Sequence, residues 1–260
     1  MGGAFFILHT MTRLSTQTGH FRDALLDLAN ALALIEGGGD ITAPRMERIS
    51  GIKVKIDEMM PEGEGTHFSV EDDTNNTNVL DLYINSRLDP AAVVLHQIAP
   101  LSKINGKAST ATAVANADNS GYVILPSDFI RLKAFKMVGW LTDVSKAFST
   151  EDTIYKKQKS VYIRGGKVKP VCILNEAMID VGGIPTVTKI LEYYSLEEED
   201  SHNIEKFIYI PEVAAENIQA NLTDALEWIC AKNILQITGR TKEDIDMAEK
   251  NIQTCFVNLK

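Results

Sequence analysis

The sequence contains few cysteines and no long apolar run. The three cysteines, Cys172, Cys230 and Cys255, follow no CxxC or other ligand-like spacing, which fits thiols packed as small core hydrophobes in a reducing compartment. The apolar stretch 4–8 is shorter than the roughly 7–15 residues of a signal-peptide core, and no basic residue precedes it. Because no segment approaches the ~20 apolar residues of a membrane helix, we expect neither secretion by this route nor a membrane span.

Signatures of catalysis and of cofactor binding are also missing from the sequence. It contains no GxSxG elbow, Walker motif, HExxH, CxxC or dinucleotide fingerprint. The five histidines never fall within four residues of one another, and His96, beside apolar neighbours, is expected to be packed or partly exposed rather than a ligand. We therefore expect no enzyme activity, no cofactor, no catalytic residue and no metal site.

Two acidic clusters have ordinary structural interpretations. Asp244 and Asp246 lie in the first turn of an expected helix, where carboxylates interact favourably with the helix dipole. The run Glu197–Asp200 follows an expected strand and offers no neutral oxygen ligands that would complete a cation site. We interpret it as a solvated loop.

Charge is unevenly distributed along the chain. The formal net charge is −9 over 260 residues, which argues against simple non-specific binding to nucleic acid. Between Arg131 and Lys169, ten basic residues accompany only three acidic ones, so this segment carries +7 and the remainder −16. The ten basic residues are Arg131, Lys133, Lys136, Lys146, Lys156, Lys157, Lys159, Arg164, Lys167 and Lys169.

Apolar periodicity predicts helices toward both ends of the chain. The expected elements there are helices over 15–36, 44–60, 79–88 and 89–99, with a polar, acidic loop over 61–78. The glycines 37–39 read as a helix stop, because a P-loop would need a following Gly-Lys-Ser/Thr. Toward the C-terminus a second apolar stripe predicts a helix closed by Gly239, and a cap at Thr241–Asp244 opens a final helix. That stripe comprises Ala215, Ile218, Leu222, Ala225, Ile229 and Leu235.

Between these helices the periodicity changes to two, which predicts strands. They are expected over 122–125, 130–138, 140–144, 160–164, 168–174, 187–194 and 206–210. The alternation slips at Phe135, which indicates a bulge, and Gly165-Gly166 indicates a two-residue hairpin turn.

The order of elements predicts an α+β fold. We expect a helical bundle built from N- and C-terminal helices, with a central, mostly antiparallel β-sheet insertion. The expected regions are an N-terminal helical region with an acidic loop over 1–104, a central β region over 121–210, and C-terminal helices over 211–260 that complete the bundle. The length allows either one large domain or two small ones.

The basic segment leaves two interpretations open. Six cations could face DNA phosphates along a channel, or they could be the ordinary solvent face of a hairpin. Neither Tyr155 nor Tyr162 forms a recognisable stacking platform and no RNP-type motif occurs, so sequence-specific recognition is not expected. The six cations are Lys156, Lys157, Lys159, Arg164, Lys167 and Lys169.

One block resembles a recurring stretch of bacteriophage head-to-tail adaptor proteins. From Tyr122 to Trp140, a strand reaches a Leu-Pro-x-Asp-Phe-x-Arg turn and continues into a second strand that ends near a tryptophan. Further blocks match those of the adaptor proteins and follow in the same order as there, over 155–158, 169–171, 191–194, 225–228 and 239–240. The pattern is similar to the adaptor or ring proteins of short-tailed and crAss-like phages, and it covers roughly Leu82 to Lys260.

This resemblance implies a structural virion protein that assembles in the host cytoplasm. Its subunits would form a ring of about twelve copies below the portal, extend the DNA channel and provide a docking platform for the tail. The implied partners are further copies of the chain, the portal protein, other tail or ring proteins, and genomic DNA that passes without sequence-specific contact.

Three other functions stay open on the sequence alone. The chain could be another tail or baseplate component of a phage, a DNA-binding protein that uses the segment 131–169, or an enzyme with an unrecognised site. Closed symmetric rings would favour the adaptor, whereas salt-dependent DNA affinity of the isolated monomer would favour the DNA-binding protein.

Overall fold

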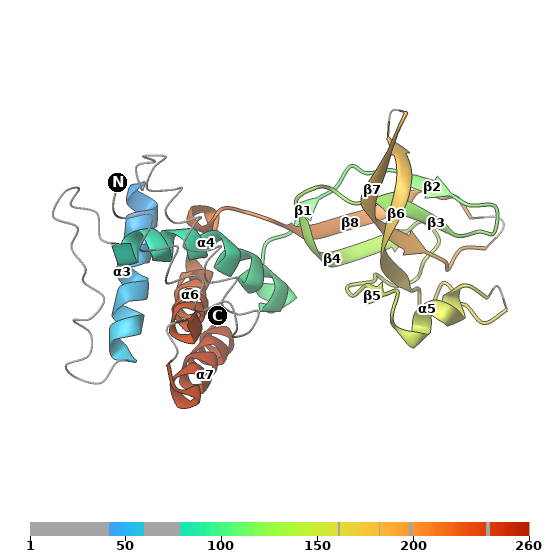
Figure 1. The fold of residues 1–260 in the computed structure, drawn as a ribbon. Helices are drawn as coiled ribbons and strands as arrows, with labels where there is room; N and C mark the ends of the chain where they lie inside the picture. Colours follow the sequence, from blue (N-terminus) through green and yellow to red (C-terminus); the bar gives the residue numbers. More distant parts are fainter. Residues whose placement is uncertain are drawn as a thin grey trace, which may run out of the picture. The chain divides into compact units, whose positions relative to one another are not determined.

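The chain folds into two compact units. A computed structural model describes residues 42–59, 79–160, 162–181, 183–197, 200–237 and 240–259 (Figure 1). The helical unit combines the chain up to Leu95 with the chain from Ala214 onward, and the β unit runs from His96 to Val213. The predicted α+β class is confirmed: N- and C-terminal helices pack together, and the segment between them in sequence forms mostly antiparallel sheets. The helix expected over 15–36, its glycine stop and the loop over 61–78 lie outside the described residues.

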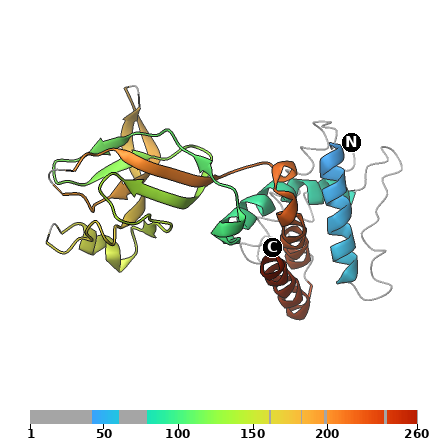
Figure 2. The same ribbon diagram turned by 180° about the vertical axis from the view of Figure 1, so that it is seen from behind.

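Helix α6 is the central element of the helical unit among the described residues. It packs against α3 on one side and α7 on another (Figures 1 and 2). Apolar side chains spaced three and four apart are fully buried on α3, as in Ile49, Ile52 and Ile56, which is the pattern of a helix with one core-facing stripe. The four α-helices are α3 (Ala43–Glu58), α4 (Val79–Ile98), α6 (Thr223–Ile237) and α7 (Lys242–Asn258).

The two helices predicted over 79–88 and 89–99 form a single helix, α4, with Pro90 inside it. A proline within a helix removes one backbone hydrogen bond and crowds the preceding turn. Here Leu88, Ala91 and Leu95 are all fully buried on both sides of that proline. Packing of this continuous apolar face therefore outweighs the local preference for a break.

The C-terminal stripe is confirmed, although its first two turns differ from the prediction. The six predicted residues from Ala215 to Leu235 are all buried, but 3-10 turns at Ala215–Asn217 and Ala220–Leu222 precede α6. The predicted cap of the last helix is confirmed, since the Thr241 side chain accepts a hydrogen bond from the Asp244 backbone N–H. The predicted closing residue Gly239 lies outside the described residues.

Two sheets build the β unit. The first has the order β1-β8-β4 and is antiparallel, and the second has the order β2-β3-β7-β6-β5, with only β5 and β6 parallel. The first contains β1 (Lys107–Ala108), β8 (Ile204–Pro211) and β4 (Phe129–Met137). The second contains β2 (Ala113–Ala115), β3 (Gly121–Ile124), β7 (Ile184–Tyr193), β6 (Cys172–Val181) and β5 (Phe148–Ser149). Two short helices complete the unit, the 3-10 turn η2 (Leu101–Lys103) and α5 (Thr153–Gln158).

Side chains from both sheets form one apolar cluster. Phe135 lies at its centre, edge-on to Trp140 and to Phe207 with ring centroids 5.7 and 5.5 Å apart. Leu191 and Tyr193 join it from β7 and are fully buried. Aromatic side chains of this size supply large buried areas, so the cluster accounts for most of the core of this unit.

The hairpin predicted around Gly165-Gly166 is wrong. Residues 162–171 form turns instead of strands, and they follow the short helix α5. Tyr162, Ile163 and Val168 are all exposed, so the apolar spacing of this stretch corresponds to no buried face among the described residues. The long hairpin is formed by β6 and β7, where Val181 pairs with Ile184 across a two-residue connection that includes Gly183 at a φ of 89°.

One further strand prediction needs correction. The stretch 140–144 is not a strand, because Gly139 at a φ of 94° turns the chain after β4, and only Val144 returns to pair with Phe135 in an isolated bridge. The irregularity predicted near Phe135 is present, because the register of β4 against β8 shifts between Leu132 and Ala134 and again between Lys136 and Met137. Both Ala134 and Phe135 are consequently buried.

Candidate functional site

The six cations predicted to face DNA lie in α5 and in the turns that follow it. Lys156 and Lys157 occupy the last turn of α5, and Lys159 is its C-cap residue. Arg164, Lys167 and Lys169 lie in the turns up to β6. Cations at this end of the helix are favoured by the negative end of its dipole.

Three of these cations are neutralised inside the β unit. Arg164 donates to the Asp118 carboxylate at 2.9 Å and to the Asp118 carbonyl at 2.8 Å, and its side chain is 8% exposed. Lys167 lies 2.8 Å from Glu197 and 3.0 Å from Asp200. Asp118 lies between β2 and β3, and Glu197 and Asp200 lie between β7 and β8, so these pairs tie the loop to two separate segments of the β unit. The carboxylates offset most of the charge of Arg164 and Lys167.

Lys159 lies beside aromatic rings and a carboxylate, with its side chain 55% exposed. Its Nζ lies 4.8 Å from the Tyr155 ring centroid and 3.7 Å from a Glu192 oxygen. Burial opposes the charge of Lys159, but Tyr155 and Glu192 outweigh it and raise the pKa of the ammonium. A cation held over a ring occupies the face on which a base would stack, so Tyr155 is not a stacking platform.

Lys156, Lys157 and Lys169 carry the remaining charge. All three are exposed, and the described part of the chain holds no ion pair for any of them. The surface available to phosphate therefore carries three cations instead of the six expected from the sequence. Such a surface gives a weak, salt-sensitive attraction with no base-reading group.

A polar hollow of about 250 Å³ adjoins this segment. Tyr194 donates its hydroxyl to Glu192 at the wall, and burial raises the pKa of Tyr194 well above its usual value. Ser120 also donates to Asp118 there. The hollow is lined by Asn116, Asp118, Ser120, Gly121, Tyr122, Lys159, Glu192 and Tyr194. No pattern in the sequence indicated Asp118 or Glu192, because Asp118 lies 46 positions from its partner Arg164.

The histidines and cysteines among the described residues are engaged in packing. His96 is buried with its Nδ1 2.9 Å from the Pro211 carbonyl, and burial lowers its pKa. Cys230 is buried, which raises the pKa of its thiol to about 12. Thiols at such a pKa stay protonated and unreactive near neutral pH. Within the ranges that the structure describes, no three His, Cys, Asp or Glu side chains are grouped to hold a metal ion.

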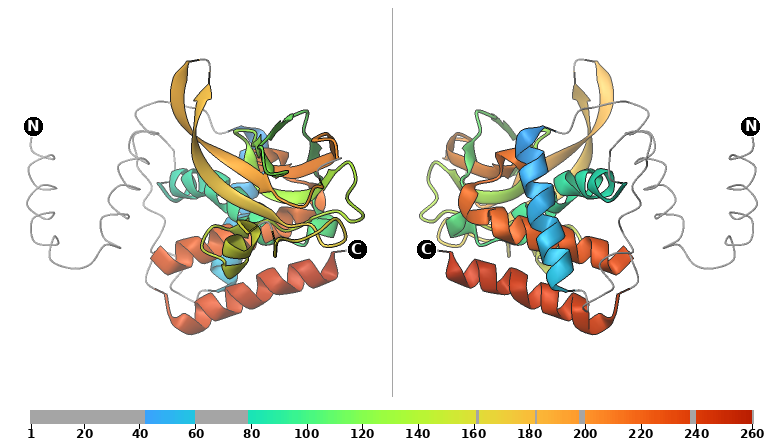
Figure 3. Two further views of the ribbon diagram at one scale, coloured as in Figure 1. Left: turned by 90° about the vertical axis from the view of Figure 1, so that its right-hand side faces the viewer. Right: turned by 90° about the vertical axis from the view of Figure 1, so that its left-hand side faces the viewer.

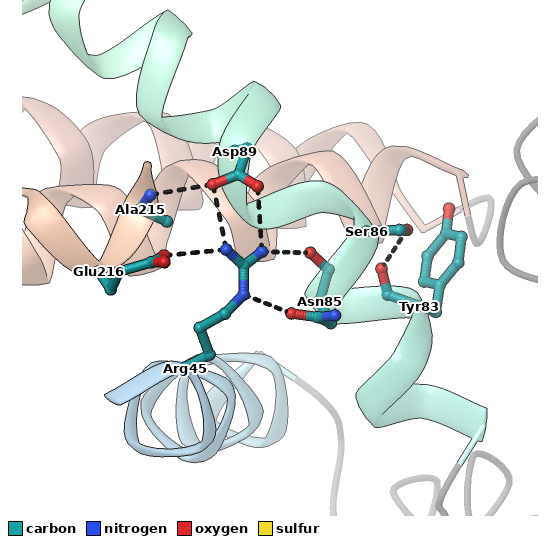
Figure 4. Close-up of polar contacts among 7 residues, drawn as sticks. All are labelled: Arg45, Tyr83, Asn85, Ser86, Asp89, Ala215 and Glu216. Atoms are coloured by element: carbon teal, nitrogen blue, oxygen red, sulfur yellow. Dashed lines mark hydrogen bonds and ion pairs between the residues drawn. The ribbon is translucent and has the colours of Figure 1, made fainter. Parts of the chain in front are cut away.

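A polar network in the helical unit joins three elements around Arg45 (Figure 4). From α3 its guanidinium reaches Asp89 at 3.1 Å, Glu216 at 2.9 Å and the Asn85 side chain at 2.7 Å. The other Asp89 oxygen accepts from the Ala215 backbone N–H at 2.9 Å. Asp89 lies inside α4, where the prediction placed the start of a separate helix, and it ties α4 to the chain that leads into α6. Forked, charge-assisted bonds of this kind fix geometry.

No protein-family model matches the chain, and a search of curated proteins finds no significant relative. Among the described helices, none is long and apolar enough to cross a membrane.

Proposed function

We propose that this chain is a structural virion protein that assembles as an adaptor ring below the portal of a tailed bacteriophage. It would extend the DNA channel and provide a docking platform for the tail. Its partners would be further copies of itself, the portal, and other ring or tail proteins. The proposal starts from the ordered blocks that resemble phage adaptor proteins, and it is supported by what their residues do in the fold.

The turn from Leu125 to Arg131 carries the proposal, because its two charged side chains, Asp128 and Arg131, join elements of the β unit. Asp128 accepts hydrogen bonds from Tyr209 on β8 and from Lys107 on β1, both at 2.8 Å. Arg131 donates to the carbonyls of Gln97 and Ala99 at 2.8 and 2.9 Å, where the β unit begins. Side chains that tie separate elements together in this way fix the shape of the subunit. This is the role expected of a motif in a structural protein.

Trp140, at the end of the same block, has a corresponding structural position. Its Nε1–H donates to the Ser195 carbonyl at 2.9 Å, and its ring packs edge-on against Phe135. A buried tryptophan whose N–H has a partner anchors the core around it. This supports a function in which the motif stabilises a rigid subunit.

The exposed cations Lys156, Lys157 and Lys169 fit the passage of DNA along a channel. Phosphate contacts attract DNA without reading its sequence. Because Lys159, Arg164 and Lys167 are already paired within the unit, the attraction left over is small. A dedicated DNA-binding protein would need a larger free positive surface, so the pairing favours the adaptor over that alternative.

Oligomeric state tests the proposal directly. The full chain, alone and mixed with the portal protein from the same virion, would be examined by mass photometry and negative-stain electron microscopy. We expect closed rings of about twelve copies, formed alone or on the portal. A chain that stays monomeric alone and also fails to bind the portal contradicts the proposal.

A charge-reversal variant tests the position of α5. Lys156→Glu with Lys157→Glu leaves the Lys159–Glu192 pair intact, whereas reversing Lys159 would place two carboxylates together. Lys242→Glu with Lys250→Glu on α7 changes the net charge equally and serves as the control. We expect both variants to form rings, and only the α5 variant to weaken binding of DNA to the ring, with a salt slope reduced by about 1–2. Equal DNA binding by the two variants would rule out α5 as the channel surface, and loss of rings in the α5 variant alone would make α5 an inter-subunit contact.

A further inference from the structure

The hairpin of β6 and β7 continues beyond the sheet as an isolated two-stranded ribbon (Figures 1 and 3). Strand β5 pairs with β6 only at Ile173 and Leu174, and β3 pairs with β7 only from Ile190 onward. Among the described residues, 175–181 and 184–188 pair with each other alone. Two-stranded ribbons are marginally stable in water, and unpaired strand edges are templates for association.

Both faces of this ribbon expose apolar side chains. Met178 and Val187 lie directly opposite each other on one face and are 73% and 64% exposed. Ile184, which points to the other face by the alternation of the strand, is 68% exposed. Charged side chains flank Met178 and Val187 on their face, and threonines share the face of Ile184. Large apolar side chains this exposed on both faces of a ribbon are typical of a surface that a partner covers.

A second exposed apolar surface lies at the far end of the same unit. We call it the loop patch, formed by Leu141, Tyr162, Ile163 and Val168. The Leu141 N–H donates to the Lys167 carbonyl and the Thr142 hydroxyl to the Val168 carbonyl, both at 3.0 Å, so the two loops lie side by side. All four side chains are exposed. The loop patch follows α5, and Figures 1 and 3 place α5 at the end of the unit opposite the ribbon tip.

The charges beside the two surfaces are complementary. Lys189 lies opposite Glu176 in the register of the hairpin, which leaves the exposed Asp180 as the charge of the ribbon that no cross-strand cation offsets. The loop patch carries the exposed Lys169, for which the described residues provide no ion pair. Opposite charges of this kind orient an encounter between two apolar surfaces.

We infer that the ribbon of one copy docks on the loop patch of a second copy of this chain. Two different surfaces at opposite ends of the β unit give a head-to-tail interface, and such an interface closes into a ring when the rotation per subunit allows it. This inference rests on the proposed function and identifies the lateral contact of that ring. The second copy covers both faces of the ribbon and pairs its free edge, which explains why neither is protected within one chain.

Paired variants of the full chain test this contact. The ribbon variant carries Met178→Ser with Val187→Ser, and the loop variant carries Leu141→Ser with Val168→Ser. The control, Met247→Ser with Val257→Ser, removes a methionine and a valine exposed on α7. Under the conditions in which the wild-type chain forms rings, sedimentation velocity should show monomers for the ribbon and loop variants and rings for the control. Melting temperatures within ~2 °C of wild type would establish that each variant is folded.

Mixing the two variants distinguishes this contact from a general loss of assembly. In an equal mixture, the intact ribbon of the loop variant meets the intact loop patch of the ribbon variant, and no second functional interface remains. The mixture should therefore form dimers and no rings. Rings formed by the ribbon variant alone would overturn the inference while leaving the proposed function in place. A mixture that stays monomeric would overturn the pairing of these two surfaces. If the wild-type chain forms no rings under any condition, the proposed function itself fails.

Discussion

The two halves of the β6–β7 hairpin share one pairing register and differ completely in environment. Near the sheet, Cys172, Leu191 and Tyr193 are fully buried in the cluster between the sheets, and Ile173 packs on the opposite face with Tyr194. Toward the tip, the equally apolar Met178 and Val187 are exposed. The comparison indicates that the pairing register depends on the two strands themselves. Whether their side chains are buried depends on which other elements pack against the two faces of the hairpin.

The largest effect is expected in the inner half of the hairpin. Leu191→Ala removes a fully buried side chain from the cluster between the sheets. Such truncations cost about 2–5 kcal/mol, because both transfer energy and cavity formation oppose folding. Urea unfolding of the full chain measures this, and a loss below about 0.5 kcal/mol would contradict the placement of Leu191 in the core.

A matching truncation extends the comparison to the helical unit. Leu222 is fully buried in the turn that precedes α6. We expect Leu222→Ala to destabilise the chain by about 2–5 kcal/mol, as for a core leucine. If the free energy of unfolding changes by less than about 0.5 kcal/mol, the C-terminal stripe does not contribute a core and belongs to an interface.

A change at the ribbon tip should have a local effect only. Gly183 has a φ of 89°, in a region that costs a residue with a side chain about 1–2 kcal/mol. Gly183→Ala should therefore open the ribbon more often and accelerate amide hydrogen exchange over 176–187 by about 5–30-fold. Exchange in β4 should stay unchanged, and an equal acceleration there would mean that ribbon and core unfold together.

Truncation in the outer half should leave monomer stability nearly unchanged. Met178→Ala removes an exposed side chain, and surface substitutions usually lie within about 0.5 kcal/mol of wild type. Urea unfolding of the monomer, alongside Leu191→Ala, measures the contrast directly. A loss comparable with that of Leu191→Ala would show that the ribbon packs within its own chain, which would remove the contrast between the two halves.

A small effect that depends on pH is expected at the ion pair that holds the loop segment to the β2–β3 turn. A hydrogen bond from Ser120 lowers the pKa of Asp118, burial opposes this, and Arg164 lowers it further, to about 2 against a usual 3.8. Because the folded pKa lies below the unfolded one, ionised Asp118 stabilises the fold above about pH 4, and this contribution is lost as the pH falls through about 2. Solvent screening keeps it below about 1 kcal/mol.

Asp118→Asn tests this linkage. The variant should lose this small contribution, below about 1 kcal/mol, at neutral pH and should approach the stability of wild type near pH 2, so that the free energy of unfolding depends less on pH between about 4 and 2. Glu151→Gln, at an exposed carboxylate with no described ion pair, is the matched control. Identical pH profiles for the wild-type chain and Asp118→Asn would show that the Asp118–Arg164 contact contributes no stability.

Local patterns in the sequence were sufficient for the order and type of most elements. Apolar spacing predicted α3 to within two residues at each end, the buried stripe from Ala215 to Leu235, and the position of β4. The Thr241 cap follows from neighbouring residues and is confirmed. These features depend on interactions within a few residues, which periodicity and capping chemistry report directly.

Only the tertiary structure decided where apolar and charged side chains end up. The stretch 162–170 has the residue spacing of a strand but forms turns, and it pairs with none of the described strands. Pro90 lies inside α4 because the buried face on both sides of it continues. The free charge of the basic segment fell from six cations to three because Asp118, Glu192 and Asp200, distant in sequence, lie beside it. Contacts between residues so far apart in sequence produce no periodic pattern along the chain. Local sequence patterns therefore predicted most of the helices and strands, whereas long-range packing decided which apolar and charged side chains stay exposed.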